Sequence, residues 1–106
     1  MSYRYMRILV MFDLPVTTAA ERRAYTLFRK YLLKNGFLML QESVYCKIAQ
    51  NPVAADSVID ALRKNKPPTG LVQLLRVTEK QYAKMEYIAG ESQLDVLNDD
   101  RRLVVL

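Results

Sequence analysis

The segment YMRILVMF, residues Tyr5 to Phe12, is the strongest structural signal in the sequence. It is a short, nearly continuous apolar run, which is typical of a strand buried on both faces near the middle of a sheet. Asp13 follows the run directly, and Pro15 then interrupts strand pairing because proline has no backbone N–H. The sequence therefore predicts a central strand that carries a carboxylate at its carboxyl end.

A helix is predicted between Thr18 and Asn35. Thr18 and Glu21 have the spacing of a capping box, in which each side chain accepts a hydrogen bond from the other residue's backbone N–H. Apolar residues then recur at spacings of three, four and seven, and Asn35-Gly36 supplies a stop. The expected inner face of this helix consists of Ala20, Ala24, Leu27, Phe28, Tyr31 and Leu32.

The middle of the chain predicts one or two strands and a second helix. Residues 37–49 are rich in strand formers, but Gln41-Glu42-Ser43 interrupts them, so the pattern fits two short strands or one bent strand. Asn51-Pro52 then begins a helix, and Lys66-Pro67-Pro68 ends it. The inner face expected for this helix consists of Ala55, Val58, Ile59 and Leu62.

Three more strands are predicted over residues 70–77, 82–89 and 101–106, with a polar break at residues 78–81. Tyr82 to Ala89 alternates as an edge strand does. The element order is the split βαβ plan of an α+β, ferredoxin-like βαββαβ domain with an additional C-terminal strand, in one domain over residues 1–106. Nothing follows the last strand, so it is well placed to join a partner's sheet.

Composition excludes several classes of chemistry. The chain has no histidine and three glycines, so histidine-based triads and glycine-rich phosphate loops are ruled out. Cys46 stands alone, so it forms no intrachain disulfide and is expected to be a small buried hydrophobe. No apolar run approaches the roughly 18 residues needed to cross a bilayer, so we expect a cytoplasmic protein with no membrane partner.

The net charge of +5 comes entirely from the first half of the chain. Residues 1–50 hold eight basic and three acidic side chains, whereas residues 51–106 hold eight of each. Five cations fall opposite the apolar face of the first predicted helix, within an arc of about 140°. This one-sided charge favours phosphate binding, although a solvated helix face also carries charge without binding anything. The five cations are Arg22, Arg23, Arg29, Lys30 and Lys34.

Asp13 is the carboxylate best placed for chemistry. At a strand end beside a turn it can bind a divalent cation or position water. One carboxylate is too few to hold Mg²⁺ unless water, phosphate or a second copy completes the shell, and a two-fold dimer would bring two Asp13 side chains together. The structural alternative is that Asp13 ends the strand by hydrogen bonding within the Asp13-Leu14-Pro15 turn.

Four separated segments in this order resemble the CRISPR-associated Cas2 family: MFDLP (Met11 to Pro15), the arginine-rich helix, QESVY (Gln41 to Tyr45) and VTEKQ (Val77 to Gln81). The likeness runs from about Arg4 to Leu106. It implies a ferredoxin-like homodimer in which the last strand of each subunit extends the other's sheet. It also implies CRISPR adaptation, in which the dimer lies between two dimers of the CRISPR integrase and holds duplex DNA. Its backbone contacts would be Arg22, Arg23, Arg29 and Lys30.

The resemblance also implies a metal-dependent endonuclease that acts on single-stranded RNA or duplex DNA. Asp13 would be the catalytic and metal-binding residue, with one Mg²⁺ shared by both subunits. Phe12 stands where other members often have tyrosine, so a phenol is absent from this chain's version of the site. Cleavage by this subunit is not expected to be needed for adaptation. The alternative function is a toxin-like metal-dependent endoribonuclease that acts without an integrase.

Overall fold

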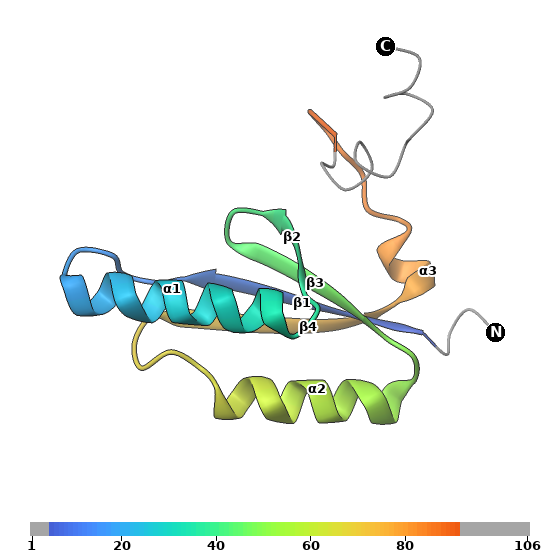
Figure 1. Cartoon of the computed structure of the whole chain (residues 1–106). Helices are drawn as coiled ribbons and strands as arrows, with labels where there is room; N and C mark the ends of the chain where they lie inside the picture. Colours follow the sequence, from blue (N-terminus) through green and yellow to red (C-terminus); the bar gives the residue numbers. More distant parts are fainter. Residues whose placement is uncertain (1–4, 92–106) are drawn as a thin grey trace, which may run out of the picture.

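Strand β1 lies inside a four-stranded antiparallel sheet of order β2-β3-β1-β4 in the computed structural model, which describes residues 5–91. Helices α1 (Ala19–Lys34) and α2 (Pro52–Lys64) lie on one side of the sheet, and α3 (Glu79–Tyr82) and the residues from there to 91 lie on the other side (Figure 1). This arrangement confirms the ferredoxin-like expectation; the strand expected over residues 101–106 lies outside the described residues. The elements are β1 (Met6–Asp13), α1 (Ala19–Lys34), β2 (Leu38–Gln41), β3 (Val44–Ala49), α2 (Pro52–Lys64), β4 (Leu71–Thr78) and α3 (Glu79–Tyr82).

The core forms between β1 and the two long helices. Ile8, Val10 and Phe12 alternate along β1 and are 0%, 0% and 6% exposed. Because successive strand residues point to opposite faces, these three side chains all point toward the helices. Val10 lies opposite Tyr45 of β3 and Leu74 of β4, so the centre of the core spans three strands. The helices complete it with Phe28, Leu32, Ala55, Ile59 and Leu62.

The residues between 37 and 49 form two strands rather than one bent strand. Val44 of β3 pairs with Gln41 of β2, and the register shifts between Met39 and Gln41. The backbone N–H of Phe12 also donates to the carbonyl of Ser43 at 3.0 Å. The chain therefore turns through residues 41–43 as a hairpin whose second strand is held by β1.

The capping box at the start of α1 is confirmed. Glu21 N–H donates to Thr18 Oγ1 at 3.1 Å, and Thr18 N–H donates to Glu21 Oε1 at 2.9 Å. The inner face is narrower than the sequence predicts, because Leu27 is 67% exposed whereas its neighbour Phe28 is 2% exposed. Leu27 lies about 100° around the helix from Phe28, and neither the sheet nor α2 covers that side.

The prediction of an edge strand over Tyr82 to Ala89 is wrong. Thr78 caps a helical turn, α3, since Gln81 N–H donates to Thr78 Oγ1 at 3.1 Å and Thr78 N–H donates to Gln81 Oε1 at 2.8 Å. No strand occurs in residues 83–91. A second capping box therefore forms a helical turn where the alternating pattern predicted a strand, and the described chain offers no neighbouring strand for that pattern to pair with.

None of the helices within residues 5–91 combines the length and the apolar character that a membrane span requires.

Gly70 holds the end of β1 in place. It has φ +96°, and a Cβ at this position would lie 2.6 Å from Leu14 Cδ2 and 3.0 Å from the carbonyl oxygen of Asp13. Asp13 pairs with Leu71, the next residue, and Leu14 is only 9% exposed. The backbone that carries Asp13 is thus packed directly against a position where only glycine fits.

We expect Gly70→Ala to lower the free energy of unfolding by about 2–4 kcal/mol, because the added methyl clashes and a left-handed backbone disfavours alanine. The matched control is Gly90→Ala. Gly90 has φ +76°, but an added methyl there would have no neighbour within 4 Å among the described residues, so this substitution should cost only the left-handed backbone penalty of about 1–2 kcal/mol. Urea denaturation of both variants measures the difference, and equal costs would contradict the packing role of Gly70.

Candidate functional site

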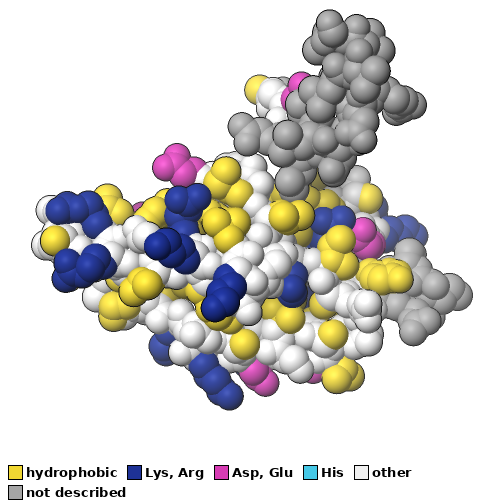
Figure 2. Space-filling model, viewed as in Figure 1, with side chains coloured by type: hydrophobic (Ala, Val, Ile, Leu, Met, Phe, Trp, Pro, Cys, Tyr) yellow, Lys and Arg dark blue, Asp and Glu magenta, His cyan; other side chains and the backbone are white. Residues whose placement is uncertain are grey.

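The five predicted cations of α1 lie on its outer side, and together they are called the basic face (Arg22, Arg23, Arg29, Lys30 and Lys34). Figure 2 shows lysine and arginine side chains following one another along α1. Glu21 is the one acidic residue of this helix, and its carboxylate is occupied by the backbone N–H groups of Thr17 and Thr18. The basic face therefore contains no carboxylate of its own helix that would neutralise it.

The cations of the basic face differ in whether their side chains already make hydrogen bonds within the protein. Arg22 Nη1 donates to the carbonyls of Val16 and Thr17 at 3.2 and 2.7 Å, which ties the helix to the preceding loop. Arg29 Nε donates to Tyr45 Oη at 2.8 Å. Among the described residues, Arg23, Lys30 and Lys34 are exposed and have no hydrogen-bond or ion-pair partner. These three retain their full capacity to bind an external anion.

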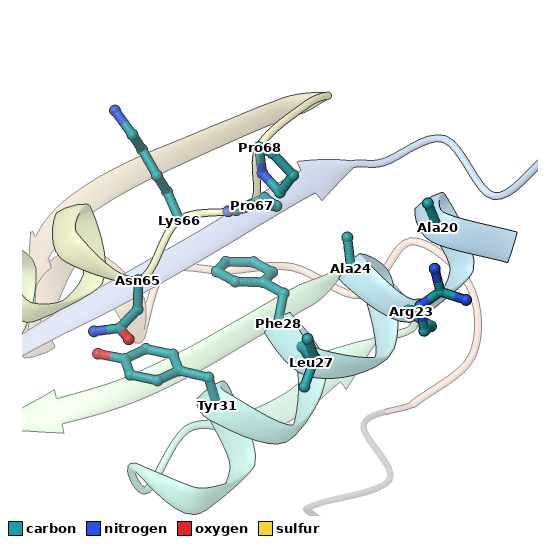
Figure 3. A pocket seen from close by; sticks show the side chains of 10 residues that line it. All are labelled: Ala20, Arg23, Ala24, Leu27, Phe28, Tyr31, Asn65, Lys66, Pro67 and Pro68. Atoms are coloured by element: carbon teal, nitrogen blue, oxygen red, sulfur yellow. The ribbon is translucent and has the colours of Figure 1, made fainter. Parts of the chain in front are cut away.

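A groove of about 570 Å³ runs beside the basic face, between α1 and the segment Asn65–Pro68. In Figure 3, Phe28 points from α1 toward the two prolines on the opposite side, while Arg23 stands near one end. Arg23 and Lys66 are the charged residues of the lining, which includes no carboxylate. The positive surface therefore extends past the helix to the segment that precedes β4.

Asp13 lies at the end of β1, exposed, and on the sheet face opposite the helices. Within residues 5–91 there is no group of three or more histidine, cysteine, aspartate or glutamate side chains that could hold a metal ion. A single described subunit therefore does not supply a complete set of ligands for Mg²⁺. If Mg²⁺ binds here, Asp13 would need ligands from a second copy, water or a phosphate.

Phe12 does not share the side of Asp13. Strand alternation sends its ring into the core, where it stacks on Tyr45 at 5.7 Å and meets Phe28 edge-on at 5.2 Å between ring centroids. An aromatic residue at position 12 is therefore a core residue in this chain. Because the ring at position 12 points into the core, phenylalanine instead of tyrosine at this position does not change the groups that lie beside Asp13.

The sheet face opposite the helices is largely apolar and is called the open face. It is centred on Leu9, Cys46 and Leu75, which lie side by side on three strands. Residues of the segment 85–91 line a pocket together with Leu9 and Met11 of this face, and outside that pocket several large apolar side chains remain about half exposed. They are Leu38 (54%), Ile48 (50%), Leu71 (54%) and Leu75 (51%).

Arg7 fixes α3 at one end of the open face. It forms a bidentate ion pair with Glu79, lies 4.1 Å from the ring centroid of Tyr82, and approaches Cys46 Sγ at 3.7 Å. The hydrogen bond to Glu79 raises the pKa of the Arg7 guanidinium, and burial raises the pKa of the Cys46 thiol. Cys46 is thus the buried residue that the sequence predicts.

The open face and the partner of Arg29 were not predicted from the sequence. The open face is visible only once the register places Leu9 between Cys46 and Leu75. The contact between Arg29 and Tyr45 joins two segments 16 residues apart, and no spacing rule predicts it. Alternation in β3 is the one signal in the sequence, since it puts Tyr45 and Cys46 on opposite faces.

The chain is similar to several known proteins. Residues 6–85 match the family model described as CRISPR associated protein Cas2. A relative from Treponema denticola, named CRISPR-associated endoribonuclease Cas2, is 58% identical over 101 residues, which cover 95% of this chain and 100% of the relative. A relative of the same name from Streptococcus mutans is 50% identical and matches over 95% of this chain and 93% of its own length. A solved structure titled "Crystal structure of cas2" superposes with a TM-score of 0.51 at 16% identity, over 84% of this chain and 91% of that one, which supports the fold alone.

Proposed function

The chain belongs to the CRISPR-associated Cas2 family, and from this premise we propose that it is a CRISPR adaptation subunit that binds duplex DNA through the phosphate backbone. The observation that carries the proposal is the basic face of α1, where cations lie without carboxylates from the same helix among them. In this function the dimer bridges two dimers of the CRISPR integrase and presents DNA for spacer acquisition.

The geometry of the basic face suits the repeating charge of a duplex. Arg23 and Lys30 are seven residues apart, so they lie on one side of α1 at a separation of about 10 Å along the helix axis. Phosphates of one DNA strand follow one another at about 3.4 Å along the duplex axis, so the two cations would contact different phosphates. Such contacts set position and carry no sequence information, as expected for a protein that handles DNA of any sequence.

We further propose that the functional unit is a homodimer formed through the open face. Leu38, Leu71 and Leu75 are each about half exposed there, and stacking two such faces would remove this apolar surface from water. Asp13 lies on the same side of the sheet, so a two-fold axis through the open face near the end of β1 would bring two Asp13 carboxylates together.

A second candidate function is phosphodiester cleavage by the paired Asp13 carboxylates, on single-stranded RNA or duplex DNA. The names of the Treponema denticola and Streptococcus mutans relatives support it, since both are called endoribonucleases. A bound Mg²⁺ would supply an activated water and stabilise the charge that develops on the phosphate. The exposed strand-end position of Asp13 would place its carboxylate within reach of a cation and a phosphate backbone. A toxin-like ribonuclease without an integrase is the corresponding alternative to adaptation.

Replacing Arg23 and Lys30 together by glutamate should weaken binding of a 30-base-pair duplex by more than about ten-fold, and the slope of log affinity against log salt should fall by about 0.9 for each phosphate that is no longer bound. The charge-matched control is Lys64→Glu with Lys80→Glu, two exposed cations away from α1. Fluorescence anisotropy across a salt series measures both quantities, and equal effects in the two variants would show that only net charge matters.

Leu75→Asp should convert the dimer into a monomer, because a carboxylate at the centre of the open face would be buried without a partner. The control is Val53→Asp on α2, where valine is 74% exposed and no interface is proposed. Light scattering after gel filtration gives the mass of each variant. A Leu75→Asp protein that remains dimeric would remove the open face from the proposed interface.

Asp13→Ala should abolish divalent-cation-dependent nuclease activity and weaken Mn²⁺ binding measured by calorimetry, because it removes the carboxylate from both subunits. Duplex binding, and spacer integration with the cognate integrase, should stay within about two-fold of wild type. Asp60→Ala, which alters an exposed carboxylate paired with Arg63 on α2, is the control. If Asp13→Ala lost integration but still bound DNA, Asp13 would take part in the adaptation reaction. If the wild-type protein cleaved RNA and were toxic without an integrase, the toxin-like alternative would be favoured.

A further inference from the structure

We propose that the hydroxyl of Tyr45 is a positioning group for phosphate binding: it holds Arg29 so that both terminal nitrogens of the guanidinium face outward. The inference rests on the proposed binding of duplex DNA by the basic face. It assigns Tyr45, a residue of the sheet, to an interface that otherwise consists of helix residues. It also separates Arg29 from Arg23, Lys30 and Lys34, which have no such support among the described residues.

Tyr45 is a rigid support. Its side chain is 0% exposed, and its ring stacks on Phe12 with 5.7 Å between centroids and 25° between planes. β3 holds its backbone opposite Val10 of β1, in the middle of the sheet. A ring enclosed in this way cannot move with the helix surface. The hydroxyl therefore offers a fixed acceptor at the boundary between core and solvent.

Arg29 contacts this acceptor through Nε alone, at 2.8 Å. Neither Nη1 nor Nη2 of Arg29 has a hydrogen-bond or ion-pair partner among the described residues. A guanidinium has five N–H donors in a planar fork, so four remain for a ligand. Two parallel donors match two oxygens of a phosphate, which is the geometry that makes arginine a strong phosphate ligand.

The groups around Arg29 favour its charged form, which arginine keeps at any working pH. The hydrogen bond to Tyr45 raises the pKa of Arg29, and smaller contributions in the same direction come from Tyr25 and Glu42. Glu42 lies in the turn of the β2–β3 hairpin and is exposed, so its attraction for Arg29 is screened by water. Holding a long side chain in one orientation before binding lowers the entropy lost when a phosphate arrives.

The competing interpretation is that Arg29 only satisfies the buried hydroxyl of Tyr45 and contacts no ligand. Both interpretations predict some loss of stability when either partner changes, because the contact is partly buried. They differ in DNA binding. If Arg29 only satisfies the hydroxyl, removing that hydroxyl leaves DNA affinity unchanged; if Tyr45 positions Arg29, affinity falls and the effects of the two residues do not add.

The test is a double-mutant cycle on duplex affinity with the full chain. Tyr45→Phe keeps the ring and should weaken binding of a 30-base-pair duplex about three- to five-fold, whereas Arg29→Gln should weaken it about ten-fold. The variant with both changes should bind no more weakly than Arg29→Gln alone. Across a salt series, Arg29→Gln should lower the salt slope by about 0.9 for each phosphate that Arg29 neutralises, and Tyr45→Phe should lower it less because the charge remains.

Tyr31→Phe is the matched control, because the Tyr31 hydroxyl has no partner among the described residues; its affinity should equal that of wild type. If Arg29→Gln does not fold, Arg29→Lys replaces it in the cycle, since lysine keeps the charge and loses the fork. The inference would be overturned if Tyr45→Phe bound duplex as tightly as wild type, or if the fold-losses of the two single variants multiplied in the double variant. In either case the proposed function would stand as long as the wild-type protein binds duplex. Failure of the wild-type protein to bind duplex would overturn both.

Discussion

Side chains alternate along β1, and this alternation sets what lies on each face of the sheet. Residues 8, 10 and 12 belong to the core, so residues 7, 9, 11 and 13 must face the other side. An interior strand with apolar residues on both faces needs a cover on both faces. The helices provide one cover, and the open face still exposes large apolar side chains at Leu71 and Leu75. The same alternation separates Asp13 from the aromatic ring of Phe12.

The basic face divides into cations that already make a hydrogen bond within the subunit and cations that have no partner among the described residues. Arg22 holds the loop before α1, and Arg29 reaches the buried Tyr45, whereas Arg23 and Lys30 have no partner among the described residues. Charge patterning alone treats these residues as equivalent. Their difference comes from their position on the helix. Arg22 and Arg29 are about two turns apart and lie on one side of α1. Arg23 and Lys30 lie on a side about 100° further round, where Arg23 lines the groove.

Local patterns predicted most of the fold correctly. The apolar run of β1, the capping box at Thr18 and the Asn51-Pro52 start of α2 each depend on residues close in sequence, so the sequence alone reveals them. The edge strand over Tyr82 to Ala89 failed because an alternating pattern needs a neighbouring strand, and Thr78 with Gln81 formed a helical turn instead. The prediction for Leu27 failed because helix periodicity indicates which residues share a side and not how much of that side is covered.

Residue types and short spacings were enough to predict the family, the excess of positive charge on α1, the place of Asp13 at a strand end, and the order of the elements up to β4, except whether residues 37–49 form one strand or two. Three features are visible only in the folded chain: Arg29 donates a hydrogen bond to Tyr45, Gly70 packs against the backbone of Asp13, and Leu9, Cys46 and Leu75 form one apolar face. These contacts join segments far apart in the chain, and it is the pairing of the strands and the packing of α1 on the sheet that bring them together.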